Sequence, residues 1–141
     1  MDRCVSCLFF VLLVGAAGCA QEDGPRVVNG CTIVPGTSCR GARLNGEDLV
    51  ASELAGADLN GAVLQGTNLS FANLDGADLS NTNLAQANLT GASLVGANLF
   101  KANLIDANFT GADITDVDWS SATCPDGASG NEPTGCVDHL R

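Results

Sequence analysis

The chain has 141 residues, enough for one domain with its termini, and its 16 acidic residues outnumber 6 basic ones to give a net charge of −10. A surface this negative repels nucleic acid and anionic lipid headgroups and favours basic partners if it favours any. The stronger interpretation of the charge is that it keeps a small β-rich protein soluble. With no Tyr, one His and one Trp, the chain is also poor in catalytic side chains.

Residues 1–18 are typical of a signal peptide. A short polar start precedes an apolar run from Leu8 to Val14, and small residues follow it. The run is far shorter than the roughly 20 residues that a membrane-spanning helix needs, and the small residues suit signal cleavage. We therefore expect an exported protein.

Two processing routes are open at the end of this segment. The sequence LVGAAGC at residues 13–19 resembles the lipobox of bacterial lipoproteins, although Ala16 stands where that family prefers Leu. The resemblance implies that Cys19 is lipidated and that the protein is an outer-membrane or periplasm-facing lipoprotein. The alternative is cleavage after Ala20 and secretion. Residues 19–30 carry Gly, Pro and charge without periodicity, and we expect them to form a flexible tether.

A five-residue phrase then repeats without interruption over residues 42–121. Across its sixteen units a small residue, Ala in eleven of them, is followed by Asn or Asp in twelve, then by a large apolar centre and two freer positions. We predict that the centres form the core. They are Leu44, Leu49, Leu54, Leu59, Leu64, Leu69, Leu74, Leu79, Leu84, Leu89, Leu94, Leu99, Leu104, Phe109, Ile114 and Trp119.

The period of five excludes straight elements. Five residues advance about 500° on an α-helix, so the centres would scatter around its axis. On a straight strand an odd step places alternate centres on opposite faces. The chain must therefore bend once per unit, always in the same sense, so that stacked coils bury a continuous column of Leu. The frequent Gly at the fifth position suits such a bend.

With its phrase A(D/N)LxG, the chain is identified as a member of the pentapeptide-repeat family. The resemblance implies an all-β fold, a right-handed quadrilateral β-helix with 20 residues per coil. Sixteen units then make about four coils, roughly 19 Å long at the spacing of parallel strands. Residues 31–41 fit a disulfide-capped N-terminal coil before this solenoid, and residues 122–141 a disulfide-capped C-terminal tail.

The cysteines support export. Cys4 and Cys7 leave with the signal, and either processing route removes Cys19 from the thiol pool. Four cysteines remain, an even set that suits an oxidising compartment and allows three pairings. A disulfide requires Cα atoms within about 7 Å, and the two caps lie at opposite ends of the body. We therefore predict the bonds Cys31–Cys39 and Cys124–Cys136.

The acidic residues suggest one alternative function. A stack of polar residues is expected outside the core, with a second stack beside it: Asp58, Asp78, Asn98 and Asp118, then Glu53, Asn73, Ser93 and Asp113. Regular carboxylates resemble DNA phosphates, and some cytoplasmic family members inhibit DNA gyrase by mimicking DNA. The export signal, the disulfide caps and the preference for Asn all argue against such a role here.

No catalytic or metal site is expected. The acidic group Asp113, Asp116, Asp118 and Asp126 follows no Ca²⁺-loop spacing. The single His139 lies two residues from the C-terminus, so no pair of nucleophile and base can be argued. We expect no enzyme, no cofactor and no nucleic-acid partner.

Only departures from the repeat remain as candidates for recognition. Apolar residues lie at outward positions, and a bulky one replaces a corner Gly: the candidate partner surface is Phe71, Phe100, Lys101 and Ile105. The sequence predicts a non-catalytic scaffold or interaction module of the bacterial envelope, with an unidentified protein partner.

Overall fold

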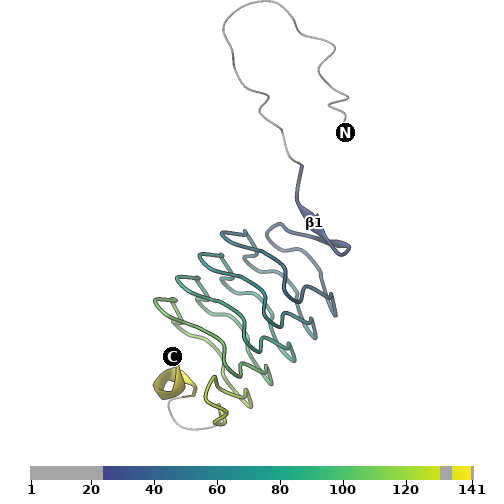
Figure 1. Cartoon of the computed structure of the whole chain (residues 1–141). Coiled ribbons are helices and arrows are strands. Elements are labelled where there is room, and N and C mark those ends of the chain that lie inside the picture. Colours follow the sequence, from purple (N-terminus) through teal and green to yellow (C-terminus); the bar gives the residue numbers. More distant parts are fainter. Residues whose placement is uncertain (1–23, 131–134, 141) are drawn as a thin grey trace, which may run out of the picture.

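A computed structural model describes residues 24–130 and 135–140 (Figure 1). The expected signal peptide, the lipidation site Cys19 and tether residues 19–23 lie outside these ranges. The described part contains two short strands, β1 (Val27–Val28) and β2 (Cys31–Thr32), and one 3₁₀-helix, η1 (Val137–His139). It contains no α-helix, and no helix in it is long and apolar enough to cross a membrane.

Residues 20 positions apart pair in parallel throughout the repeat. The paired residue is the one before each centre, as in Asn68 with Asn88, and the series runs from Ser38–Asp58 to Asn103–Thr123. The chain therefore returns to the same side every 20 residues, and we call each such stretch a circuit. Figure 1 shows the circuits stacked on one another along the length of the body.

Backbone hydrogen bonds join neighbouring circuits at every unit. In one example the Leu69 N–H donates to Asn88 O at 2.8 Å, and the Asn88 N–H donates to Thr67 O at 2.9 Å. At the following bend the Phe71 N–H donates to Thr90 O at 2.9 Å. These bonds satisfy the backbone groups that a bent chain would otherwise leave unpaired.

Each bend is a β-turn with one special position. The Ala72 N–H donates to Leu69 O at 3.1 Å, and the third turn residue, Phe71, has a φ of +59°. A positive φ at this position is the signature of a type II turn, which favours Gly. Gly91 fills the same position one circuit later with a φ of +65°. The turn chemistry therefore explains the fifth position of the repeat.

The centres fill the interior. The thirteen Leu centres all have 0% relative exposure, and Phe109 and Trp119 are buried. Ile114 is only partly buried, unlike the other centres. It lies in the last circuit of the repeat.

The N-terminal cap begins earlier than expected. Val28 is buried, and β1 pairs antiparallel with β2 through the two-residue loop Asn29–Gly30. Both loop residues have positive φ, +49° and +83°, as a type I′ hairpin requires. The predicted tether of residues 19–30 therefore does not extend to residue 30. The Asn-Gly pair between apolar residues is the sequence signal for this hairpin, and the expected tether overlooked it.

Both predicted disulfides are confirmed, Cys31–Cys39 and Cys124–Cys136, each with Cα atoms 5.3 Å apart. Cys39 lies 20 residues before Leu59, and Cys124 lies 20 residues after Leu104, so each bond includes one cysteine at a centre position. The register of the repeat thus reaches beyond residues 42–121 at both ends. At the C-terminal end the Phe109 and Trp119 rings meet edge to face, with centroids 5.8 Å apart.

Candidate functional site

Among the described residues, the fold's own side chains fill the interior. Leu and Ala side chains occupy it, and every buried side-chain N or O atom among the described residues has a hydrogen-bond partner. Within the same residues, no three His, Cys, Asp or Glu side chains gather as a metal site. Recognition by this part of the chain must therefore use the outer surface.

The predicted acidic stacks have a structural role that the sequence reasoning missed. The side-chain oxygen of the residue before a centre accepts the backbone N–H two positions later, as Asn88 Oδ1 does from Thr90 N at 3.1 Å. Asp78 does the same for Ser80 at 3.0 Å. Short Asn and Asp side chains favour this local Asx arrangement. The preference for Asn or Asp at this position therefore reflects the turn and is no evidence for a ligand.

The same bonds act on two carboxyl groups near the C-terminal end. The side chain and backbone N–H of Thr115 hydrogen-bond to Asp113 and lower the pKa of its carboxyl below the ordinary value. Hydrogen bonds from Ser120 lower the pKa of Asp118 in the same way. Bonds that favour the charged form have this effect even at exposed positions.

In one unit the acceptor comes from a neighbouring circuit. Ser93 replaces Asn or Asp before Leu94, and the carboxylate of Asp75 in the preceding circuit takes over. Asp75 Oδ1 accepts the Val95 N–H at 3.0 Å and the Ser93 hydroxyl at 2.5 Å. A carboxylate at a bend thus also stabilises the fold, because it accepts hydrogen bonds from the next circuit.

The four candidate partner residues do not form one surface. Lys101 Nζ lies 4.9 Å from the centroid of the Phe100 ring, a cation–π contact, and exposed Ile105 follows at the next bend of the same circuit. Phe71 lies at a different bend, because the 20-residue register stacks it with Ala51 and Gly91. The predicted surface therefore divides into a Phe100–Lys101–Ile105 group and Phe71 alone.

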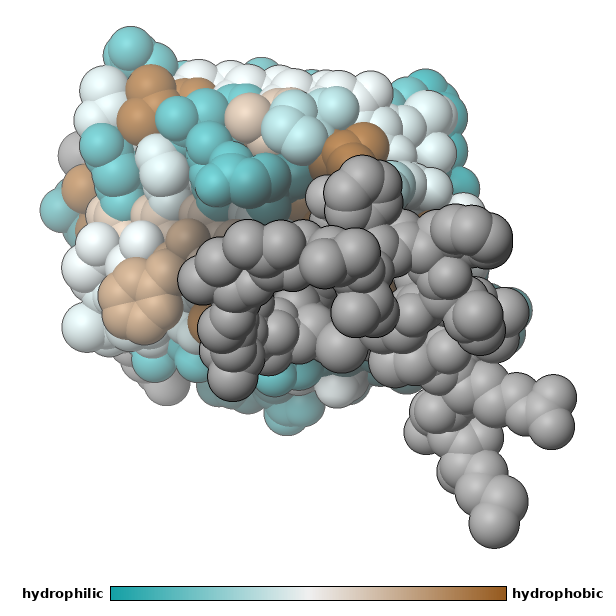
Figure 2. Space-filling view, turned by 90° about the horizontal axis from the view of Figure 1, so that it is seen from above, coloured by the Kyte–Doolittle hydropathy of each residue, from teal (hydrophilic) through white to brown (hydrophobic). Residues whose placement is uncertain are grey.

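Charge is distributed unevenly around the body. Seven carboxylates lie on two adjoining sides and the bend between them: Glu53, Asp58, Asp75, Asp78, Asp113, Asp116 and Asp118. By the same register, Lys101 and Arg40 belong to one bend, and Arg43 lies on the side that follows it. Arg40 is already paired with Asp58 at 3.2 Å. On the face seen in Figure 2, apolar atoms lie in separate small groups among hydrophilic ones.

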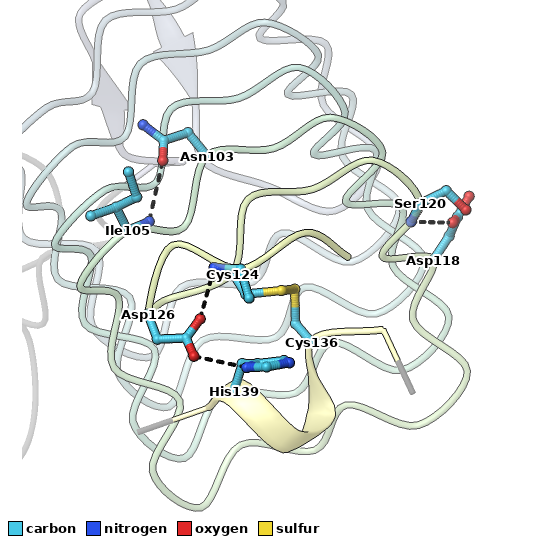
Figure 3. The surroundings of a disulfide bond; sticks show 9 residues. Asn103, Ile105, Asp118, Ser120, Cys124, Asp126, Cys136 and His139 are labelled. Atoms are coloured by element: carbon cyan, nitrogen blue, oxygen red, sulfur yellow. Dashed lines mark hydrogen bonds and ion pairs between the residues drawn. A yellow bond between two sulfur atoms is a disulfide. The ribbon is translucent and has the colours of Figure 1, made fainter. Parts of the chain in front are cut away.

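The C-terminal cap contains an acid–histidine pair. His139 Nδ1 lies 2.8 Å from Asp126 Oδ2, beside the Cys124–Cys136 bond (Figure 3). All four described cysteines are in disulfides, so none of these four can act as a nucleophile with this pair. The contact joins η1 to the turn at Asp126 and so holds the cap. No sequence signal predicts this contact, because neither residue belongs to the repeat.

A shallow hollow lies beside the N-terminal disulfide. Its lining includes Asn29, Ser38 and Arg40. The Arg40 guanidinium is occupied by Asp58 and Asn60, and the Asn29 side chain donates to Arg43 O at 2.8 Å. These polar groups hydrogen-bond within the protein and stabilise the cap. They are therefore not available as a group of donors and acceptors directed at a ligand.

The chain matches one protein family. The model of the pentapeptide-repeat family matches residues 35–70, 48–81 and 77–116, together more than half of the chain. No curated protein matches it. Among solved structures, alr5209, a pentapeptide repeat protein from Nostoc PCC 7120, is 35% identical over 57% of this chain and 66% of its own, with a TM-score of 0.56.

Two further structures are less similar in three dimensions. A pentapeptide repeat protein from the Arabidopsis thaliana thylakoid lumen is 28% identical over 60% of this chain and 66% of its own, with a TM-score of 0.29. HetL from Nostoc sp. strain PCC 7120, which is involved in heterocyst differentiation regulation, is 28% identical over 67% and 62%, with a TM-score of 0.27. This chain spans slightly less than two thirds of each relative's length.

Proposed function

Because the chain belongs to the pentapeptide-repeat family, we propose that it is a non-catalytic scaffold or interaction module of the bacterial cell envelope. The observation that carries this proposal is that most positions of the repeat serve the fold itself. Leu centres and Asx turns are committed to the fold, so only the departures at the bends are left for recognition.

The proposed architecture is a right-handed quadrilateral β-helix of about four coils. Parallel pairing at 20-residue intervals and a turn every five residues support it. The likeness to alr5209 supports the same fold. Such a body is a rigid rod whose surface positions are fixed relative to one another.

Export to the envelope is part of the proposal. The apolar run of residues 8–14 and the lipobox-like sequence ending at Cys19 support it. The two disulfides add support, because such bonds persist in oxidising compartments. Mass spectrometry of the mature chain tests the anchor: we expect a diacylglyceryl group on Cys19. A free N-terminus at Gln21 would contradict lipidation and would indicate that the protein is secreted.

The proposed partner surface is the Phe100–Lys101–Ile105 group. It combines an aromatic ring, a cation and an aliphatic side chain of 42% exposure on a chain that is otherwise acidic. Aromatic and cationic side chains dominate many binding hot spots.

Site-specific photocrosslinking in intact envelopes tests this surface. A photoreactive residue at Phe100 or Ile105 should give one crosslinked protein product. The control is Thr110, which is exposed and lies at a different bend from both Phe100 and Ile105. Equal labelling from all three positions, or from none, would contradict a partner site in this group.

The alternative is an acidic inhibitor that mimics DNA and acts on a DNA-binding enzyme. The seven carboxylates on two adjoining sides favour it. Cell fractionation separates the two proposals, because only a cytoplasmic chain could meet such an enzyme. Recovery of the chain with the envelope would exclude the alternative.

A further inference from the structure

Three units of the repeat contain Asn-x-Ser or Asn-x-Thr, the acceptor motif for N-linked glycosylation of exported proteins. They are residues 68–70, 88–90 and 108–110. The turn already explains these residue types, because the Asn oxygen accepts both the backbone N–H and the hydroxyl of the Ser or Thr two positions later. The motif is therefore informative only where the Asn side chain can also reach another molecule.

Asn108 differs from the other two asparagines in its surroundings. The 20-residue register stacks all three in one column, in which Asn68 pairs with Asn88 and Asn88 pairs with Asn108. Asn108 ends this column in the described part of the chain, and there it pairs on one side only. It is exposed, as is Thr110, whereas Asn68 and Asn88 are partly buried. Of the three motifs, the one at Asn108 is thus the most accessible to an enzyme.

The two ends of the Asn108 side chain have different roles. Its Oδ1 accepts the Thr110 N–H at 3.0 Å and the Thr110 hydroxyl at 2.7 Å. Its Nδ2 donates no hydrogen bond within the described residues, whereas the Asn88 Nδ2 donates to Asn68 Oδ1 at 3.2 Å. A glycan is attached to the amide nitrogen. At Asn108 the turn therefore fixes the oxygen and leaves the reacting atom unengaged.

The residue two positions before Asn108 adds a second sequence signal. It is Asp106, which is exposed, and the other two motifs have Gly66 and Gln86 at this place. Transferases of bacterial envelopes that modify Asn in this motif require an acidic residue there. Residues 106–110 therefore form a complete bacterial acceptor sequence, and the other two motifs do not.

We propose that Asn108 carries an N-linked oligosaccharide, and this proposal rests on the export proposed above. In the reaction the Asn108 Nδ2 attacks the anomeric carbon of an oligosaccharide held on a lipid diphosphate. A carbon–nitrogen bond forms, the carbon–oxygen bond to the phosphate breaks, and the lipid diphosphate leaves. A basic group of the transferase takes the amide proton. The transferase belongs to the host cell, and this chain supplies the acceptor.

Mass spectrometry of the full chain recovered from its native host tests the proposal. Cleavage after Arg43 and Lys101 separates residues 102–141, which contain Asn108, from residues 44–101, which contain the other two motifs. We expect an added sugar mass on the first peptide alone, and fragmentation should place it on Asn108. An unmodified first peptide, or a sugar on the second, would overturn the proposal.

A pair of matched substitutions shows whether the motif is responsible. Thr110→Val and Thr90→Val each remove one hydroxyl that hydrogen-bonds to the preceding Asn, at 2.7 Å and 2.6 Å. Only Thr110→Val destroys the exposed motif. We expect it to remove the sugar completely, and Thr90→Val to leave the sugar in place. A sugar that survives Thr110→Val, or one that disappears with Thr90→Val, would contradict the assignment.

A second variant covers the case in which Thr110→Val does not fold. Asn108→Asp keeps an oxygen that accepts the turn hydrogen bonds, as Asp113 does for Thr115, but lacks the amide nitrogen. It should fold and carry no sugar, and a sugar still present on its peptide would overturn the proposal.

Fractionation of the same cells separates this inference from the proposed function. A chain that stays in the cytoplasm without sugar would overturn both. A chain that is recovered with the envelope or from the medium, but whose Asn108 is unmodified, would overturn the glycosylation alone.

Discussion

Replacing Leu79 by Ala tests how the interior is packed. Leu79 has 0% exposure and lies in one column with Leu59 and Leu99, one circuit to either side. Its backbone N–H donates to Asn98 O at 2.8 Å. Because hydrogen bonds join the circuits at every unit, the walls around the missing side chain cannot collapse inward.

The expected loss follows from two terms. Deleting three buried carbons costs about 0.8 kcal/mol each, or about 2.4 kcal/mol. A cavity that does not relax adds about 2 kcal/mol, so Leu79→Ala should destabilise the fold by about 4–5 kcal/mol, near the top of the range for such changes. Leu79→Asp should abolish cooperative unfolding, because it buries a charge with no partner.

The control is Ile114→Ala. Ile114 is a centre of the same repeat but only partly buried, so its loss should cost about 1–2 kcal/mol. Urea unfolding followed by circular dichroism measures both changes, provided the slope with denaturant stays constant. A cost for Leu79→Ala below 1 kcal/mol, or below that of Ile114→Ala, would refute the inward packing of the centres.

Two further predictions concern the caps and the turns. Removing the Cys124–Cys136 bond by a double Ser substitution should lower the free energy of unfolding by about 3 kcal/mol, from the 12-residue separation; an unchanged urea midpoint would mean that the bond constrains nothing. Asp113 and Asp118 have pKa values lowered by hydrogen bonds, so their contribution to stability is complete above the ordinary Asp pKa of about 3.9 and is lost as pH falls through the lowered values. Asp118→Asn keeps the oxygen that accepts the turn hydrogen bond but removes the group that titrates. Thermal melting should therefore show that this variant loses less stability than the parent chain between pH 5 and pH 2.

The repeat could be predicted from sequence because the same residue types recur every five positions and meet the same steric requirements each time. A period of five excludes helix and strand, and it requires each Leu to turn inward. Cys39 and Cys124 were paired correctly because their partners belong to opposite ends of the body. The residue classes at the small, central and corner positions each follow from one steric demand, repeated at every unit.

The features that could not be predicted lie beyond the ends of the repeat or depend on hydrogen bonds that the repeat pattern does not specify. The Asn29–Gly30 hairpin was read as a tether because its neighbours share no period with the repeat. The Asp126–His139 contact joins two segments of the C-terminal cap that the repeat does not place. The role of Asn and Asp as turn acceptors was missed because an outward position suggested solvent or ligand.

The separation of Phe71 from Lys101 needed the register. A spacing of five places both at bends, but only the number of residues per circuit decides which bend. The spacing of five does not contain that number, which the family resemblance implies. The same register brings Phe71 onto Gly91.

One measurement tests the 20-residue register most directly: nuclear Overhauser contacts of the Phe71 ring protons in solution. We expect strong contacts to the Gly91 α-protons, because the ring packs against that backbone. Contacts from the ring to the bend residues at positions 81, 86 or 96 instead would contradict the register and the placement of every surface residue that depends on it.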